Sequence, residues 1–251
     1  MKALLKITVN KTLNKTVKRS SALRLALGLS ALLSFSEYAV ADSVPAFQVK
    51  TQPVANTQHA VEGLQKRLGQ IDSFSANFLQ LTQDNLGKTL QSVSGFMQVA
   101  KPGKLHWQTE GIYEQLVVSD GKSLWIYDAD LEQVSIKNMD NRLSETPALL
   151  LGGDVSAIDD DFIISQIPNE SSILYVLQPK DTSQLFDALE LRFNTLAKSQ
   201  PLTEMVIRDA SGQITRIEFT NVKINPEFND DLFVFTIPKG IDVIDGRHGS
   251  Y

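Results

Sequence analysis

The spacing of apolar residues predicts one helix followed by a strand. Across residues 57–72, apolar side chains recur at steps of three and four with Gln, Lys, Arg and Glu between them, which is typical of an amphipathic helix. From residue 73 the period shortens to two, because Phe74, Ala76 and Phe78 alternate with polar residues. Such alternation indicates a strand with one buried face. The chain therefore begins its patterned part with a helix that is available to pack on a sheet.

The same two-residue period recurs along most of the remaining chain. Short turns such as Lys101-Pro102-Gly103 and Ser119-Asp120-Gly121 separate many of these segments, and consecutive strands joined by such turns form an antiparallel meander. The further expected strands are 89–100, 104–109, 113–119, 122–128, 131–137, 161–167, 171–178, 186–194, 202–209, 213–223 and 232–236. The pattern predicts a mainly β protein of eleven or twelve strands.

One interruption of the strand pattern is apolar. Within residues 138–160 the chain runs from Pro147 through three leucines into Gly152-Gly153, which predicts one or two short apolar helices. Together with residues 57–72, a helix at residues 143–151 is available to cover one face of a single sheet. A sheet covered in this way forms a lidded pocket.

The N-terminus predicts export from the cytoplasm. The first 24 residues hold seven basic side chains and no acidic one, and an apolar run from Leu25 to Phe35 follows. At about 16 Å of helix this run is too short to cross a hydrocarbon core of roughly 30 Å. It is instead typical of a signal peptide, which we expect at residues 1–41 with cleavage after Ala41. A flexible segment at 42–56 and a single domain at 57–251 complete the expected organisation.

Charge and cysteine content narrow the possible partners. Removal of residues 1–41 leaves 17 basic and 28 acidic residues, a formal charge of −11. This balance argues against nucleic acid and anionic membranes as partners, and it predicts salt-sensitive docking on a basic surface. The chain has no cysteine, which excludes a thiol nucleophile, a thiolate metal site and an N-terminal lipid-modified cysteine.

The sequence offers no candidate catalytic, cofactor-binding or metal-binding residues. His59, His106 and His248 do not have the spacing of a metal-binding pair, and the chain lacks a Gly-x-Ser-x-Gly elbow. Any two acidic residues could still meet in space as a glycosidase pair. A solvated acidic surface is the simpler interpretation, and a non-enzyme is expected.

Several motifs resemble a known family. The most specific is Val-Ser-Asp-Gly-Lys-x-Leu-Trp-x-Tyr at residues 118–127. The others are Lys101-Pro102 followed by Leu105-His106-Trp107, Thr146-Pro147 followed by three leucines, and Phe233-Val234-Phe235-Thr236-Ile237-Pro238-Lys239-Gly240. Over about residues 57–247 the chain resembles the outer-membrane lipoprotein carrier proteins, which are periplasmic chaperones of the lipoprotein-localisation (Lol) system.

The resemblance implies a fold and a role. The fold would be an incomplete antiparallel β-barrel of about eleven strands with a helical lid over a hydrophobic cavity. The protein would be a periplasmic monomer that accepts lipoproteins from an inner-membrane lipoprotein-releasing ABC transporter, shields their acyl chains and delivers them to an outer-membrane receptor.

The resemblance also suggests site residues. Lys101 stands where the family commonly has an arginine that bonds to the lid backbone and latches the lid; lysine lacks the planar fork of arginine, so the latch would differ. We expect seven apolar side chains to line the cavity and lid: Leu64, Leu68, Phe96, Leu105, Trp107, Leu149 and Leu151.

Functions other than the carrier need features of their own. The outer-membrane receptor of the same pathway shares the fold but needs a lipid-modified cysteine, which this chain lacks. Two alternatives remain at this point: a periplasmic hydrolase with a carboxylate pair, and a lipid-sensing regulator built on the same half-barrel.

Overall fold

The computed structural model describes residues 57–111, 114–139, 147–181, 184–196 and 202–247. The expected signal peptide, its cleavage after Ala41 and the segment 42–56 lie outside the described residues.

The described residues form twelve strands and four helices. The first half of the chain contains α1 (Thr57–Gly69), β1 (Ser73–Gln83), β2 (Thr89–Ala100), β3 (Lys104–Glu110), β4 (Gln115–Asp120), β5 (Ser123–Asp128) and β6 (Gln133–Asn138). The second half contains the 3-10 helix η2 (Pro147–Leu151), α2 (Ile158–Asp161), β7 (Phe162–Pro168), β8 (Ser172–Pro179), β9 (Ala188–Asn194), β10 (Leu202–Arg208), β11 (Ile214–Ile224), the 3-10 helix η3 (Asp230–Phe233) and β12 (Asp242–Asp245). No helix among these is long and apolar enough to cross a membrane.

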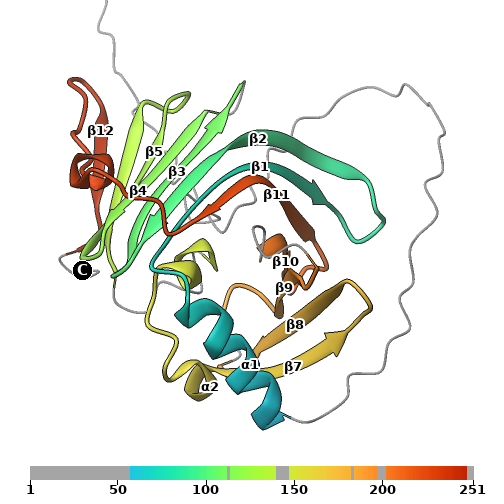
Figure 1. The fold of residues 1–251 in the computed structure, drawn as a ribbon. Helices are drawn as coiled ribbons and strands as arrows, with labels where there is room; N and C mark the ends of the chain where they lie inside the picture. The colour runs from blue at the N-terminus through green and yellow to red at the C-terminus, as the bar shows by residue number, and fades with distance from the viewer. Residues whose placement is uncertain (1–56, 112–113, 140–146, 182–183, 197–201, 248–251) are drawn as a thin grey trace, which may run out of the picture.

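All twelve strands belong to one curved sheet with two free ends. Its order is β12-β6-β5-β4-β3-β2-β1-β11-β10-β9-β8-β7, so β12 and β7 stand at the two edges (Figure 1). Neighbouring strands are antiparallel except for β12, which pairs with β6 in parallel. The prediction of a mainly β, unclosed antiparallel barrel is confirmed.

The C-terminal part of the chain corrects one predicted strand. Residues 232–236 were expected to form a strand, but η3 occupies the first two of these positions. The side chain of Asn229 caps η3 by accepting a hydrogen bond from the backbone N–H of Asp231, and the ring of Phe233 is buried. The last strand is instead β12, whose four residues are all exposed and which is held by backbone pairing to β6. Its lack of a buried face explains why no alternation predicted it.

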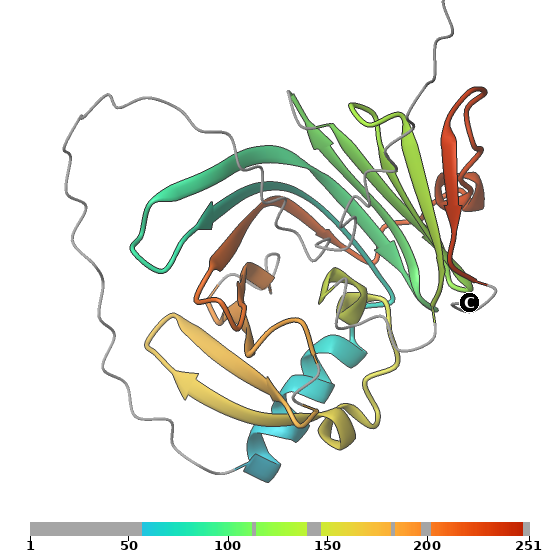
Figure 2. The same cartoon turned by 180° about the vertical axis from the view of Figure 1, so that it is seen from behind.

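The core lies on the concave side of the sheet, beneath α1 and η2. The apolar stripe of α1 is buried, and so are all five residues of η2. Both views show α1 crossing the open side of the curve, with η2 between α1 and the sheet (Figures 1 and 2). Gly63 allows this close approach, because a Cβ at its position would lie 2.7 Å from the hydroxyl oxygen of Tyr175 on β8. We refer to α1 and η2 together as the lid.

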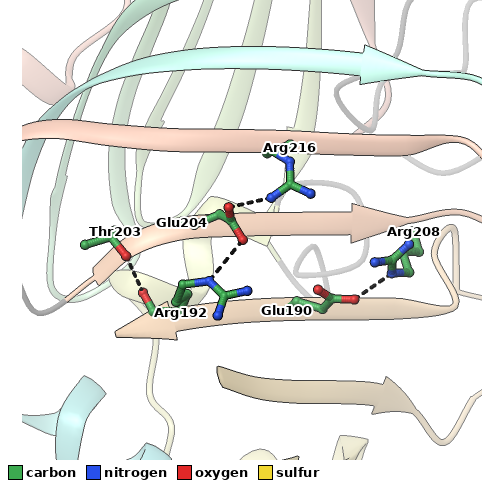
Figure 3. A network of polar contacts seen from close by, with 6 residues as sticks. All are labelled: Glu190, Arg192, Thr203, Glu204, Arg208 and Arg216. Atoms are coloured by element: carbon green, nitrogen blue, oxygen red, sulfur yellow. Dashed lines mark hydrogen bonds and ion pairs between the residues drawn. The ribbon is translucent and has the colours of Figure 1, made fainter. Parts of the chain in front are cut away.

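The convex face of β9 to β11 carries a ladder of charges instead of apolar residues. Glu204 accepts hydrogen bonds from Arg192 Nε at 3.4 Å and Arg216 Nη1 at 2.5 Å, and Glu190 accepts from Arg208 Nε at 2.6 Å (Figure 3). These residues come from three adjacent strands, so the ion pairs cross the sheet from strand to strand. The ladder marks this face as the solvent side.

Candidate functional site

The candidate site is the apolar interior between the lid and the concave face of the sheet. Side chains reach it from alternate positions of each strand, such as Leu105 and Trp107 on β3, and register places these beside Val99 and Met97 on β2. All four side chains are buried in one hydrophobic cluster with the lid residues. The lid and the sheet therefore share a single core.

Six of the seven predicted lining residues meet in this cluster. Leu64 and Leu68 enter from α1, and the others enter from β3 and η2. The six are Leu64, Leu68, Leu105, Trp107, Leu149 and Leu151, each almost completely buried. Their contact with the acyl chains of a cargo remains a prediction.

Phe96 does not belong to this group. Because side chains alternate across a strand, Phe96 faces away from the core, whereas its neighbour Met97 faces into it. Register places Phe96 opposite Gln108, and its ring stacks on that of His106 with centroids 5.6 Å apart on the convex face. The prediction that Phe96 lines the cavity is therefore wrong, because its position in the strand places this aromatic ring on the convex face.

Phe78 belongs to the interior, although it is not among the seven predicted lining residues. Its ring stacks on Trp107, with centroids 4.0 Å apart and planes at 24°. The ring passes over Gly95, where a Cβ would lie 2.6 Å from Phe78 Cζ and 2.0 Å from the carbonyl oxygen of Gln108. Gly95 thus makes room for an aromatic pair that spans three strands. The alternation of Phe78 with polar neighbours predicted this buried face of the strand.

The lid helix is also held on the side that faces β8 and β9. Arg67 Nε donates to the hydroxyl of Tyr175 at 3.4 Å, and its guanidinium lies 5.4 Å from the ring centroid of Phe193. Tyr175 and Phe193 meet edge to face, with centroids 5.8 Å apart. A contact of a cation with an aromatic face is worth about 1 kcal/mol, so Arg67 adds a weak contact to the attachment of α1.

Lys101 connects the β2–β3 turn to the end of the lid helix. Its Nζ donates to the carbonyl oxygen of Leu68 at 3.3 Å, and it lies 3.9 Å from a carboxylate oxygen of Asp72. The last carbonyls of a helix lack partners within the helix, and a cation there also interacts favourably with the helix dipole. The contact therefore stabilises the position of the lid. Its role as a release latch stays a prediction.

A cleft opens beside this contact. Its volume is about 480 Å³, and its lining residues are Gln65, Gly69, Lys101, Pro102, Gly152, Gly153, Asp154, Val155 and Ser156. Gln65 Nε2 crosses the cleft to donate to the carbonyl oxygen of Ser156 at 2.9 Å. The backbone N–H of Ser156 donates to Asp154, which lowers the pKa of that carboxyl below its ordinary value. The cleft thus lies where α1 meets the segment after η2.

Four buried hydroxyl groups of the interior pair within the protein. Thr82 and Thr215 bond to each other at 3.2 Å, the Ser119 hydroxyl donates to the carbonyl oxygen of Gly103 at 2.8 Å, and the Thr109 hydroxyl accepts from the backbone N–H of Gln115 at 2.8 Å. Among the described residues no group of three or more His, Asp or Glu is arranged to hold a metal ion. What the site offers a ligand is a large apolar surface.

The chain is similar in sequence to a family of known proteins. A family model described as outer membrane lipoprotein carrier protein LolA matches residues 69–236, more than half of the chain. An outer-membrane lipoprotein carrier protein of Hahella chejuensis is 39% identical over 73% of this chain and 87% of its own length. One from Pseudomonas syringae pv. tomato is 44% identical over 73% and 87%. A solved LolA superfamily protein from Nitrosomonas europaea is 14% identical, with a TM-score of 0.43, and covers 70% of this chain and 98% of its own.

Proposed function

The chain belongs to the outer-membrane lipoprotein carrier protein family, and we propose that it carries lipoproteins across the periplasm between two membrane partners. As a LolA-type periplasmic lipoprotein chaperone it would accept cargo from an inner-membrane lipoprotein-releasing ABC transporter. It would hold the acyl chains in its interior and deliver the cargo to an outer-membrane receptor. The comparisons support neither a hydrolase nor a lipid-sensing regulator.

The observation that carries this proposal is that leucines of the lid fill the interior of the sheet. Leu64, Leu68, Leu149 and Leu151 are all buried against the concave face. Exposing them would cost roughly 2 kcal/mol each, or about 8 kcal/mol together. A sixteen-carbon chain gains on the order of 12 kcal/mol when it leaves water, at about 0.8 kcal/mol per methylene. Exchange of lid leucines for an acyl chain is therefore favourable but far from irreversible.

This exchange explains how one protein can both take and release a lipid. A rigid preformed cavity would retain the full transfer free energy of the chain, and release would be too slow. An interior already occupied by the lid returns about 8 kcal/mol when the lid closes again, which is about two thirds of the value for one chain. We propose that Lys101 biases this equilibrium toward the closed, cargo-free state through its bond to Leu68.

The remaining organisation follows the same proposal. Cleavage after Ala41 would release a monomer whose mature N-terminus begins at Asp42, followed by a flexible segment at 42–56 and one carrier domain at 57–251. Asp42 stands where a lipid-anchored receptor would have cysteine. The mature protein would then diffuse freely between the two membranes, whereas the receptor would stay anchored in the outer membrane.

Displacement of an apolar dye tests the proposal. The purified mature protein is loaded with a dye that fluoresces in apolar surroundings and is titrated with a triacylated lipoprotein. We expect the lipoprotein to displace the dye, whereas the same lipoprotein without its acyl chains serves as the matched control and leaves the fluorescence unchanged. A protein that never binds the dye, or that both forms displace equally, would refute the carrier function.

A further inference from the structure

Trp107 carries a polar group that has no partner in the interior. Its side chain is 2% exposed, and its indole N–H finds no hydrogen-bond acceptor among the described residues. Buried N–H groups in folded proteins are nearly always paired, so an unpaired one calls for an explanation. The threonines and the serine on the same face of the sheet are paired, as described above.

The indole is held in place by a dedicated arrangement. Phe78 stacks on it at 4.0 Å, and Gly95 leaves the space that the Phe78 ring needs. Met97 and Val117, the register partners of Trp107 on β2 and β4, are apolar and buried, so they provide no side-chain acceptor. The N–H is therefore fixed in an apolar site where a ligand can reach it once the lid leaves.

We infer that the Trp107 indole N–H is a hydrogen-bond donor for an acyl carbonyl oxygen, so that the site selects acyl esters or amides over other apolar chains. This inference rests on the proposed carrier function. A fatty acyl group is apolar except at its carbonyl, where the chain joins the rest of the lipid. That oxygen accepts a hydrogen bond, whereas an alkyl ether of the same length offers a much weaker acceptor.

The closed protein contributes to this selectivity. While the lid fills the interior, the indole N–H has left water without gaining a partner, which makes the cargo-free state less favourable. An acyl carbonyl gives the donor its partner, so an ester gains over a matched ether. A single neutral hydrogen bond in such a site corresponds to about tenfold in affinity.

Two matched ligands test the inference. Displacement of the apolar dye is measured with a long-chain fatty acid methyl ester and with the ether of the same chain length. We expect the parent protein to bind the ester about tenfold more tightly and Trp107→Phe to bind both ligands equally. Trp125→Phe is the control, because Trp125 lies on the opposite face, with its ring 6.4 Å from Phe235, and the ester preference should persist.

An NMR measurement keeps the test valid if Trp107→Phe folds poorly. The protein has two tryptophans, so Trp125→Phe identifies the indole N–H signal of Trp107. We expect the ester to move that signal downfield and the ether to leave it nearly unchanged. Equal affinities in the parent, a preference that survives Trp107→Phe, or an indole signal that ignores the ester would each overturn the inference alone. If neither ligand displaces the dye, the carrier function falls and the inference falls with it.

Discussion

Replacing Lys101 with alanine removes the cation that bonds the β2–β3 turn to the lid helix. The change takes away the Nζ donor to the carbonyl oxygen of Leu68 and leaves the backbone bond from Lys101 N to the carbonyl oxygen of Asp72, 2.9 Å long, unaffected. The turn therefore keeps its place while the lid loses one contact. If the proposal is correct, the variant should close less firmly on its own interior.

The size of the effect follows from the geometry. A hydrogen bond from a charged donor is worth about 1.5–3 kcal/mol, but this bond is long at 3.3 Å and the lysine side chain is 29% exposed, so we expect about 1 kcal/mol. The ion pair with Asp72 adds almost nothing, because its atoms are 3.9 Å apart and the carboxylate is 82% exposed. A change of ~1 kcal/mol corresponds to about fivefold in the ratio of closed to open protein.

Transfer kinetics measure this ratio. If cargo and lid compete for the same interior as proposed, Lys101→Ala should bind a lipoprotein about fivefold more tightly and hand it to the receptor correspondingly more slowly. Lys104→Ala is the matched control, because Lys104 is similarly exposed and pairs with Asp230 on the convex face, 2.6 Å away. Asp72→Asn removes the ion pair but keeps the bond to Leu68, and it should behave as the parent.

Two results would refute the reasoning. Equal transfer rates for Lys101→Ala and the parent would show that the bond to Leu68 does not govern release. A comparable slowing in Lys104→Ala would show that loss of charge, rather than loss of the lid contact, causes the effect.

Three further predictions concern stability, each measured by urea denaturation. Gly95→Ala should lower the free energy of unfolding by about 3 kcal/mol, because the new Cβ would lie 2.0 Å from a backbone carbonyl oxygen. Gly69→Ala, with nothing within 4 Å of the new Cβ, should change it by less than ~1 kcal/mol, and equal effects of the two substitutions would contradict the packing argument. Glu204→Gln should lower the free energy of unfolding by about 1 kcal/mol, since this 14% exposed carboxylate pairs with two arginines. Glu190 pairs with one arginine, so Glu190→Gln should have a smaller effect, and the opposite order would contradict the role of the ladder. Burial lowers the pKa of His106 below its ordinary 6.5, so the unfolded chain binds a proton at higher pH than the folded chain does. The free energy of unfolding should therefore fall as the pH drops below about 6.5, and a His106→Gln variant with the same pH profile as the parent would refute this cause.

The sequence predicted most elements well because most have a face that packs. The helix at residues 57–72 appears as Thr57–Gly69, and most strands begin and end within a few residues of their expected positions. The strand β12 escaped prediction because all its side chains are exposed and only backbone pairing defines it. Residues 232–236 were misassigned because their apolar residues pack on the convex face from a short helix and the segment that follows it.

The site was predictable in part, for a related reason. Leucines within the apolar stripe of a helix or within an apolar run are predicted to be interior, and six of the seven predicted side chains are buried together in the core. Phe96 was misplaced because its aromatic character favoured the interior, whereas its position in the alternation puts it on the opposite face. The unpaired N–H of Trp107 depends on every neighbour at once, and no pattern in one chain reveals it.

The two free edges of the sheet have a consequence for cargo size. A closed barrel has its cross-section fixed by strand number and stagger, so its internal space cannot grow without breaking ladder hydrogen bonds. Here the strand order ends at β7 on one side and β12 on the other, so the sheet can flatten with every strand pair intact. The curvature of the sheet, which can change gradually, would then set its capacity. If the interior holds acyl chains as proposed, one carrier would fit lipids of different chain number and length.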